Sequence, residues 1–401
     1  MKKLFVILIV LIIVIWLFYF FFARQLERYF FQPTEQAGLP GVSIDKNQAE
    51  QREIIQEEDL SESETVIETE DELIEALKDI EVVASNLQIP WEIVWLPSGE
   101  MLVTQRPGNL LLINNGQTVV SIEGVSQVGE GGLQGMTLDP DFSANQYLYL
   151  YLTARKEGSL INRVERYRVS DKTLLDRTVI LDDLPAAQYH DGGRIAFGPD
   201  NKLYITIGDA GQASRAQELD FLGGKILRIN KDGSIPEDNP FSDSPIYSYG
   251  HRNPQGLAWD NLGRLWATEH GRSGASSGYD ELNLIEAGGN YGWPIIQGSE
   301  SRQGMISPVV QSGADATWAP AGLLYYQNKL FFTGLRGESL YEYNLETKEL
   351  KYHFFKEFGR LRAVALGPDA YFYLSTSNQD GRGQVREDDD KIIRINPEIF
   401  N

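Results

Sequence analysis

The chain contains no cysteine among its 401 residues. Disulfides, thiolate metal sites and cysteine nucleophiles are therefore excluded, although this absence says nothing about the cellular compartment. Basic residues are also few: 36 Lys and Arg stand against 57 Asp and Glu, which gives a formal net charge of −21. Because such a charge repels the phosphate backbone, we expect no nucleic-acid ligand.

Two metal-site signatures are missing as well. The sequence has no H-E-x-x-H zinc motif and no D-x-D-x-D-G calcium loop. A weaker cation signal is present, because Asp280 and Glu281 follow a glycine-rich loop that begins at Gly271. Backbone carbonyls and a nearby carboxylate suit a hard cation such as Ca²⁺.

A short phrase recurs six times, and it consists of a turn followed by a run of apolar or aromatic residues. The copies begin at Pro97, Asp139, Gly198, Asp260, Tyr326 and Gly367. A turn before such a run is typical of a β-hairpin, and six copies at wide spacing indicate one sheet per copy in a radial repeat. The sequence therefore predicts an all-β, six-bladed β-propeller over residues 82–401, with function in the loops after or between the phrases.

The N-terminus predicts a membrane anchor. Residues 4–23 carry no charge, and twenty residues at about 1.5 Å each span a hydrocarbon core of ~30 Å. No small-residue cleavage site follows, so we expect an uncleaved transmembrane signal anchor, with residues 1–3 in the cytoplasm and the propeller on the extracytoplasmic side of the cell membrane. Residues 24–81 are predicted to be an acidic, largely disordered spacer, because 45–81 contains fifteen acidic and only three basic residues.

Histidine is scarce, with four in the chain. His190, His251 and His270 lie in glycine-rich loops beside the repeated phrases. Each is either a general base near neutral pH or a side chain that caps a turn. His353 lies in a strand-like run and is interpreted as structural.

Arginines gather near the repeat boundaries, at positions 252, 336, 360 and 362. Arg360 and Arg362 have the spacing that places two side chains on one face of a strand. Two guanidinium groups on one face bind either an anion, such as a polycarboxylate or phosphate, or neighbouring carboxylates. Both alternatives remain open at this level.

Several motifs together resemble the glucose/sorbosone dehydrogenase family, the soluble quinoprotein aldose sugar dehydrogenases. The resemblance extends from about Val82 to the C-terminus. Its most specific motifs are His190-Asp-Gly-Gly-Arg194, Gly250-His-Arg-Asn-Pro-Gln-Gly256, Asp280-Glu-Leu-Asn-Leu284 and Gly288-Gly-Asn-Tyr-Gly-Trp-Pro294.

The resemblance implies a six-bladed propeller that binds pyrroloquinoline quinone (PQQ) over Ca²⁺ and oxidises an aldose at C1 to the lactone. It implies that His190 takes the hydroxyl proton and that the carbonyls of Gly271 and Arg272 hold the Ca²⁺. Electrons would pass to a membrane quinone or a cytochrome. The cofactor-binding residues that it implies are Arg252, Asn253, Arg336, Arg360, Arg362, Thr317 and Glu130.

The chain departs from the family pattern around this implied pocket. Tyr189 precedes the implied base, Arg272 stands where Pro is common, Arg336 stands for a Lys, and Glu130 stands for a Gln that orients the His. Since a propeller can keep its scaffold without its chemistry, two alternatives stay open. One is a cofactor-free module that binds carbohydrate or protein, and the other is a Ca²⁺-dependent lactone hydrolase.

Overall fold

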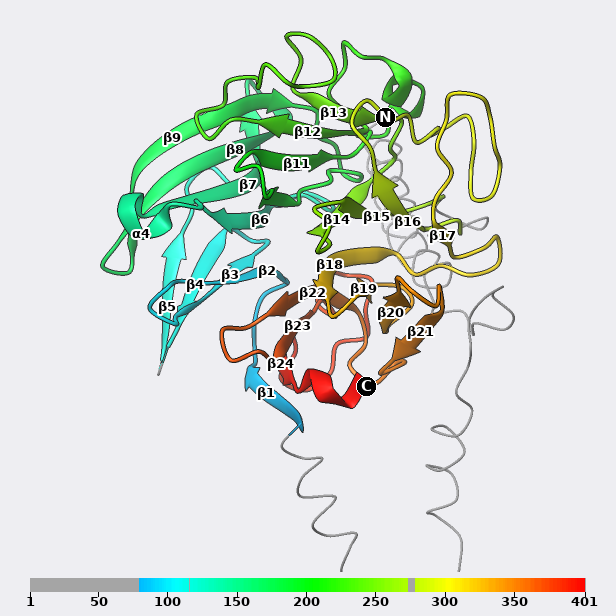
Figure 1. The fold of residues 1–401 in the computed structure, drawn as a ribbon. Helices are drawn as coiled ribbons and strands as arrows, with labels where there is room; N and C mark the ends of the chain where they lie inside the picture. Colours follow the sequence, from blue (N-terminus) through cyan, green and yellow to red (C-terminus); the bar gives the residue numbers. More distant parts are fainter. Residues whose placement is uncertain (1–78, 115, 273–277, 401) are drawn as a thin grey trace, which may run out of the picture.

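The computed structural model describes residues 79–400, except 115 and 273–277. In this part of the chain, 24 strands form six four-stranded antiparallel sheets that surround a central axis (Figure 1). The predicted six-bladed propeller is therefore confirmed. The strands of each blade are given from the innermost to the outermost. Blade one comprises β2 (Pro90–Trp95), β3 (Met101–Gln105), β4 (Asn109–Ile113) and β5 (Gln117–Ser121), and blade two comprises β6 (Leu133–Leu138), β7 (Tyr147–Lys156), β8 (Ser159–Ser170) and β9 (Thr173–Leu184). Blade three comprises β10 (Ile195–Phe197), β11 (Leu203–Ile207), β12 (Lys225–Ile229) and β13 (Ile246–Tyr249), and blade four comprises β14 (Pro254–Trp259), β15 (Leu265–Glu269), β16 (Glu281–Ile285) and β17 (Val310–Gln311). Blade five comprises β18 (Pro320–Tyr326), β19 (Lys329–Gly334), β20 (Leu340–Asn344) and β21 (Leu350–His353), and blade six comprises β22 (Leu361–Leu366), β23 (Phe372–Thr376), β24 (Ile392–Ile395) and β1 (Ile80–Ala84).

Helix is a minor component of the described residues. It is confined to α4 (Phe142–Asn145), η2 (Ala213–Gln217) and η3 (Pro397–Phe400). Within the described ranges, no helix has the length and apolar character needed to cross a membrane. The predicted anchor at residues 4–23, the cytoplasmic residues 1–3 and the spacer as far as residue 78 lie outside the described residues.

Each repeated phrase becomes the turn between the innermost and second strands of a blade, followed by the second strand itself. Successive side chains of a strand point to opposite faces of the sheet, so each second strand contributes to two cores. In β3, Leu102 packs with blade two, whereas Met101 and Val103 pack with blade six. The core is therefore a ring of six hydrophobic clusters, each between two neighbouring blades.

Hydroxyl groups near the ends of four second strands also connect the blades. Each donates a hydrogen bond to a backbone carbonyl in the innermost strand of the next blade. The four bonds join Thr104 to Gln134 at 2.6 Å, Thr268 to Ala321 at 2.8 Å, Thr333 to Arg362 at 2.7 Å and Ser375 to Pro90 at 3.3 Å. Buried carbonyls that the sheets leave unpaired are satisfied in this way.

The ring is closed by the N-terminal strand. β1 pairs antiparallel with β24, so blade six combines both ends of the described chain. β1 begins at Ile80, and the Asn396 side chain donates to Asp79 Oδ1 at 2.7 Å. The ordered propeller therefore starts two to three residues before the predicted boundary at 82, because these residues complete the sheet.

Removing β1 should destabilise the propeller. The strand makes four residue pairings with β24, and at ~0.5–1.5 kcal/mol for each hydrogen bond a chain that starts at residue 85 should lose about 2–6 kcal/mol of unfolding free energy. Denaturant titration measures the difference from a control chain that starts at residue 79. Equal denaturation midpoints for the two chains would show that the pairing of β1 with β24 contributes nothing to stability.

Candidate active site

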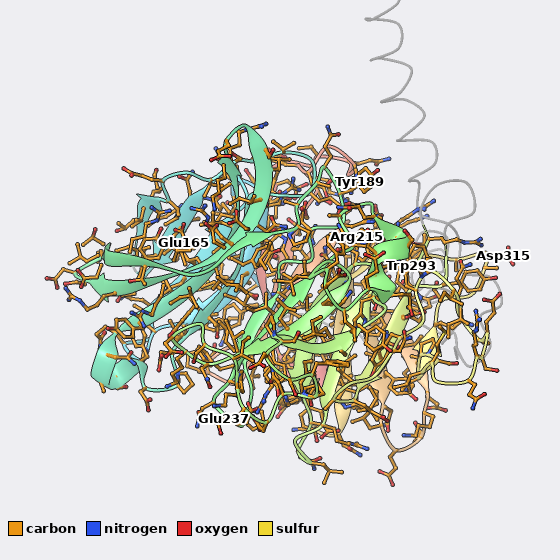
Figure 2. The ribbon with its side chains drawn as sticks, turned by 90° about the horizontal axis from the view of Figure 1, so that it is seen from above. Glu165, Tyr189, Arg215, Glu237, Trp293 and Asp315 are labelled. Carbon is orange, nitrogen blue, oxygen red and sulfur yellow. The ribbon has the colours of Figure 1, made fainter. Side chains whose placement is uncertain are left out.

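Loops at one end of the propeller enclose a cavity of about 310 Å³. Innermost and second strands are antiparallel, so the segment before the first and the segment after the second lie at the same end. Figure 2 shows Tyr189 toward the cavity end and Glu237, from the β12–β13 loop, at the opposite end. The cavity is lined by Glu130, Tyr189, His190, Arg252, His270, Gly271, Arg272, Asp280, Thr317, Ala319, Leu335, Arg336, Arg360 and Arg382.

The charge of this lining is opposite in sign to that of the whole chain. Five arginines face two carboxylates in the cavity, whereas the chain carries a formal charge of −21. Local clusters of one sign focus the field and attract ligands of the other sign. The cavity is therefore suited to an anionic ligand.

His190 lies in the loop before β10 and is held by a carboxylate. Its Nδ1 lies 2.7 Å from Oδ1 of Asp209, which follows β11. Asp209 also accepts hydrogen bonds from Trp293 Nε1 at 2.9 Å and from the Gly211 N–H at 2.8 Å. Burial raises the pKa of Asp209, but the bonds with His190 and these donors outweigh it and lower the pKa overall. An ionised Asp209 accepts a hydrogen bond from Nδ1–H of His190, so the unprotonated Nε2 carries the lone pair of a base.

The backbone around His190 is closely packed. His190 has a φ of 63°, and its carbonyl oxygen would lie 2.0 Å from a Cβ at position 208. Only glycine can occupy position 208 beside this turn. The Tyr189 ring meets the His190 ring edge-on with centroids 4.8 Å apart, and this tyrosine is 49% exposed.

Glu130 fixes the same loop from blade two. Its Oε2 accepts the His190 backbone N–H at 2.9 Å, and its Oε1 accepts Arg382 Nη1 at 2.8 Å. Burial raises the pKa of Glu130, but Arg382 and His190 outweigh it and lower the pKa well below its usual range. Glu130 therefore positions His190 through its backbone, and Arg382 neutralises the charge that the carboxylate brings.

Of the adjacent residues Arg252 and Asn253, both predicted to bind the cofactor, one lines the cavity. Arg252 lines the cavity, and its Nη1 donates to the His270 carbonyl at 3.4 Å. Asn253 is not among the lining residues. Its Oδ1 accepts the Gly192 N–H at 3.0 Å, and its Nδ2 is buried with no hydrogen-bond partner among the described residues.

The three remaining predicted arginines also differ in position. Arg336, which follows β19, and Arg360, which precedes β22, line the cavity. Arg360 is already ion-paired with Asp380 at 2.7 Å. Arg362 is not among the lining residues of this cavity; it lies in β22, where its Nη1 donates to Gln255 Oε1 at 2.5 Å, and its role toward the cofactor stays a prediction.

The predicted metal residues Gly271 and Arg272 both line the cavity. The Gly271 N–H donates to Asp280 Oδ1 at 2.8 Å, and the Arg272 carbonyl accepts the Gly278 N–H at 3.2 Å. Across the described residues, no three side chains of the metal-ligating types form a group that could hold an ion. A cation at this position would therefore depend on backbone carbonyls and on oxygens supplied by a bound ligand.

Asp280 connects neighbouring loop segments by hydrogen bonds and is not a free carboxylate that awaits a metal ion. Besides Gly271, it bonds the Thr317 hydroxyl at 2.7 Å and the backbone N–H groups of Trp318 and Ala319 at 2.6 and 2.9 Å. Four hydrogen bonds satisfy both carboxylate oxygens. Thr317 is therefore held on the cavity wall, and the metal role suggested for Asp280 by its glycine-rich loop is not supported.

Two other histidines, His251 and His353, do not line the cavity. His251 lies between Ser248 Oγ at 2.9 Å and Glu269 Oε2 at 2.7 Å. This Ser–His–Glu row is buried, with His251 and Ser248 both 0% exposed, so it cannot reach a substrate. His353 pairs with Glu342 at 2.8 Å in blade five, away from the cavity, in agreement with its structural interpretation.

Sequence reasoning missed three residues of this site. Asp209 and Trp293 hold His190, and Arg382 holds Glu130. Asp209 and Arg382 lie in the loops after the third and sixth repeated phrases, so the rule that function lies after the phrases could have found them. Trp293 lies in the Gly288–Pro294 motif of the family resemblance, to which no role was assigned. His270 was noticed but given no role, and burial lowers its pKa although Asp280 and Glu130 oppose this.

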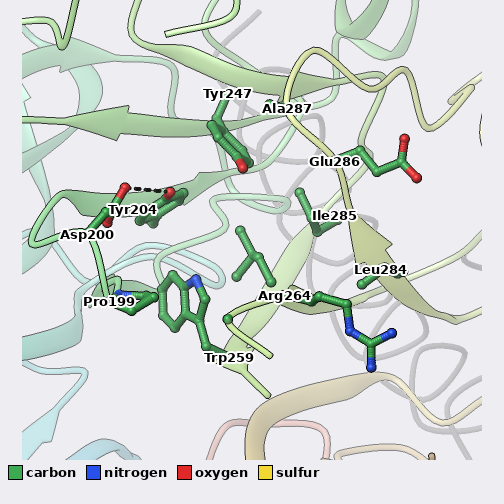
Figure 3. A pocket seen from close by; sticks show the side chains of 12 residues that line it. Pro199, Asp200, Tyr204, Tyr247, Trp259, Arg264, Leu284, Ile285, Glu286 and Ala287 are labelled. Carbon is green, nitrogen blue, oxygen red and sulfur yellow. Dashed lines mark hydrogen bonds between the residues drawn. The ribbon is translucent and has the colours of Figure 1, made fainter. Parts of the chain in front are cut away.

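A second cavity of about 470 Å³ lies at the opposite end, between blades three and four (Figure 3). Three of its polar side chains are already paired. Asp200 accepts from Tyr204 at 3.1 Å and from Arg228 at 2.9 Å, and Arg264 donates to Asp260 at 2.6 Å. With no histidine or nucleophile on its wall, this cavity is not the candidate active site.

The sequence profile of the Glucose / Sorbosone dehydrogenase family matches residues 87–393. The chain belongs to the glucose/sorbosone dehydrogenase family. The match covers all six blades from the first innermost strand onward, and it includes every site residue described above.

Individual relatives agree with the family. The aldose sugar dehydrogenase YliI of Escherichia coli is 32% identical over 346 residues, which cover 76% of this chain and 92% of the relative. The PQQ-bound aldose sugar dehydrogenase of Streptomyces coelicolor is 37% identical with a TM-score of 0.73, covering 79% of this chain and 97% of that one. A putative oxidoreductase (glucose dehydrogenase) of Thermus thermophilus is 40% identical with a TM-score of 0.74, covering 79% and 99%.

Asp191, next to His190, should make stability depend on pH. Burial raises its pKa to about 7, although the bonds from the Ala187 N–H and Asn162 oppose this, and its Oδ2 has no partner among the described residues. Between pH 4 and 7 the folded state then binds more protons than the unfolded state, so this carboxyl lowers stability as the pH rises, by at most about 1.4 kcal/mol per unit. Asp191→Asn should remove this loss.

The measurement is the unfolding free energy of wild type and Asp191→Asn at several pH values from 4 to 8. The advantage of the variant should grow between pH 4 and 7 and then level off. Asp260→Asn is the control, since the pKa of Asp260 is lowered by its bonds to Trp266 and Arg264 despite burial; this carboxyl titrates below the measured range, so its variant should differ from wild type by a pH-independent amount. A pH-independent difference for Asp191→Asn would contradict the prediction.

Proposed function

We propose that this protein is a PQQ- and Ca²⁺-dependent aldose sugar dehydrogenase that oxidises C1 of an aldose to the lactone. The observation that carries the proposal is the His190–Asp209 pair, which opens into a cavity lined by five arginines. A base next to an anion-binding pocket suits a reaction that removes a hydroxyl proton beside a polycarboxylate cofactor.

The chain's own residues account for the proton. Asp209 fixes the His190 ring so that Nε2 is free of the proton and faces the C1 hydroxyl of the sugar. Nε2 takes that proton as the C1–O bond becomes a carbonyl. Glu130 and Trp293 hold the two members of this pair in place, from blade two and from the β16–β17 loop.

The cavity lining suits the cofactor. PQQ carries three carboxylates, and Arg252, Arg336 and Arg360 present guanidinium groups from blades four, five and six. The carbonyls of Gly271 and Arg272 would hold Ca²⁺ together with oxygens of the cofactor. When bound, PQQ supplies a quinone that accepts the hydride from C1.

Location and electron transfer are parts of the same proposal. Residues 4–23 would anchor the protein in the cell membrane, and the acidic segment up to residue 78 would separate the anchor from a propeller on the extracytoplasmic side. Electrons would leave for a membrane quinone or a cytochrome. Protease treatment of intact cells with an exposed outer membrane face should release a fragment close to residues 79–401, and release only after lysis would reject this topology.

The direct test uses the purified full-length chain with PQQ and Ca²⁺. Bound-quinone absorbance and dye reduction with a panel of aldoses support the proposal. The competing function, a cofactor-free binding module, is favoured by one observation, namely that the Arg272 carbonyl already accepts a backbone hydrogen bond. Absence of both cofactor binding and turnover would favour that module.

His190→Ala should lower kcat by a factor of about 10²–10⁴, because a general base is lost, while the dissociation constant of PQQ changes much less. Steady-state kinetics and a PQQ titration measure the two quantities. His353→Gln is the matched control, since this histidine lies outside the cavity and should leave kcat unchanged. Equal turnover in His190→Ala would remove His190 from the reaction.

Arg360→Ala should weaken PQQ binding by roughly 1.5–3 kcal/mol, the range for a charge-assisted hydrogen bond. It should also lower the stability of the cofactor-free protein by about 3–5 kcal/mol, because it leaves the buried Asp380 carboxylate without its partner. The sequence alone did not predict this loss of stability, because the Arg360–Asp380 ion pair cannot be recognised from the sequence.

The double variant Arg360→Ala/Asp380→Asn separates the two effects. It removes the unpaired charge, so most of the lost stability should return while PQQ affinity stays low. Thermal unfolding and PQQ titration measure both. Recovery of PQQ affinity in the double variant would mean that Arg360 does not contact the cofactor.

A further inference from the structure

One side chain of the cavity is left without a role by the proposed function. Arg272 lines the cavity, and only its backbone carbonyl is used by the proposed Ca²⁺ site. Its guanidinium carbon lies 5.3 Å from the centroid of the Tyr279 ring. Among the described residues, its Nε is buried with no hydrogen-bond partner and its guanidinium forms no ion pair with a carboxylate.

Two neighbouring arginines show the contrast. Arg360 is paired with Asp380 at 2.7 Å and Arg382 with Glu130 at 2.8 Å. Their charges are balanced within the protein. A partly buried guanidinium with no balancing carboxylate costs solvation energy, and an anion that entered the cavity would recover it.

The cofactor does not account for Arg272. In the proposed function the three carboxylates of PQQ are assigned to Arg252, Arg336 and Arg360, which come from three successive blades. Arg272 follows β15 and contributes to the same cavity as His190 and the half-exposed Tyr189. A sugar with C1 at His190 therefore has a cation within the same enclosed space, available for a group elsewhere on the sugar.

Negative charge elsewhere on the chain makes the cationic Arg272 side chain selective for anionic ligands. With a formal net charge of −21, the protein repels anions in general, whereas this cavity has an arginine-rich lining. A neutral sugar gains nothing from an unpaired guanidinium beyond ordinary hydrogen bonds. A carboxylate or phosphate gains a charge-assisted, bidentate contact.

We infer that the substrate is an aldose that carries an anionic group, and that Arg272 is the residue that selects it. The inference rests on the proposed function, since it names the substrate class of the same site. The shared chemistry is a carboxylate or phosphate on the sugar, as in a uronic acid or a sugar phosphate. The reaction converts the aldose to its lactone and leaves the anionic group unchanged.

The test compares glucuronate and glucose 6-phosphate with glucose on the full-length chain loaded with PQQ and Ca²⁺. We expect kcat/KM for at least one anionic sugar to exceed that for glucose by about ten- to a hundredfold at low salt, as a charge-assisted contact allows. The ratio should fall as ionic strength rises. The two anionic sugars distinguish a carboxylate from a phosphate substrate.

Arg272→Gln should bring the anionic-to-neutral ratio to about one, and Arg272→Lys should keep part of it. A merely structural role would change activity on all sugars alike and leave the ratio intact. Arg264→Gln, at the opposite end of the propeller, is the matched control and should change neither ratio nor activity. A ratio near one in the wild type, or one that Arg272→Gln does not alter, overturns the inference while the proposed function stands.

A binding measurement keeps the inference independent of turnover. Glucuronate or glucose 6-phosphate should raise the thermal midpoint of the loaded protein more than glucose does, and Arg272→Gln should abolish the difference. If this difference appears with no oxidation of any aldose, the inference holds and the proposed function fails. Equal shifts for charged and neutral sugars overturn the inference.

Discussion

Closure of the ring is the constraint on which the rest of the structure depends. The pairing of β1 with β24 makes the sixth blade from both ends of the described chain, and it fixes the spacing of all six innermost strands. Five of those strands are preceded at once by a segment that contributes to the cavity, from Glu130 in blade two to Arg360 in blade six. Residues 230 positions apart therefore meet only because the sheets are arranged in a closed circle.

Carboxylates serve mainly to hold this cavity in shape. Asp280 connects the Gly271 segment to Thr317, Glu130 connects His190 to Arg382, and Asp209 orients the His190 ring. Asp280 and Asp209 are buried and Glu130 is partly buried, and each is satisfied by several donors, which is the condition under which a buried charge is tolerated. Because the carboxylates are occupied by the protein, the arginines determine the charge that a ligand meets.

The departures from the family pattern are easier to understand in this setting. Glu130 replaces a neutral amide with a charge, and Arg382 from blade six supplies the opposite charge at 2.8 Å. Tyr189 and Arg272 change the cavity wall but leave the His190–Asp209 pair intact. The scaffold and the His190–Asp209 pair are thus preserved, while the part of the wall proposed to meet the rest of the substrate differs. This pattern is consistent with a change of substrate rather than a loss of chemistry.

The amino-acid sequence by itself determined the blade count, since each blade is encoded by a local phrase of turn and alternating apolar residues. It also determined His190 and most of the cavity-lining arginines, through motifs that are contiguous in the chain. Only the tertiary structure decided the partners. Asp209 lies 19 positions from His190, Asp380 lies 20 from Arg360, and Arg382 lies 252 from Glu130. A pattern of residue types does not say which side chains meet across blades, so neither the Arg360–Asp380 ion pair nor the Arg362–Gln255 hydrogen bond could be predicted from the sequence.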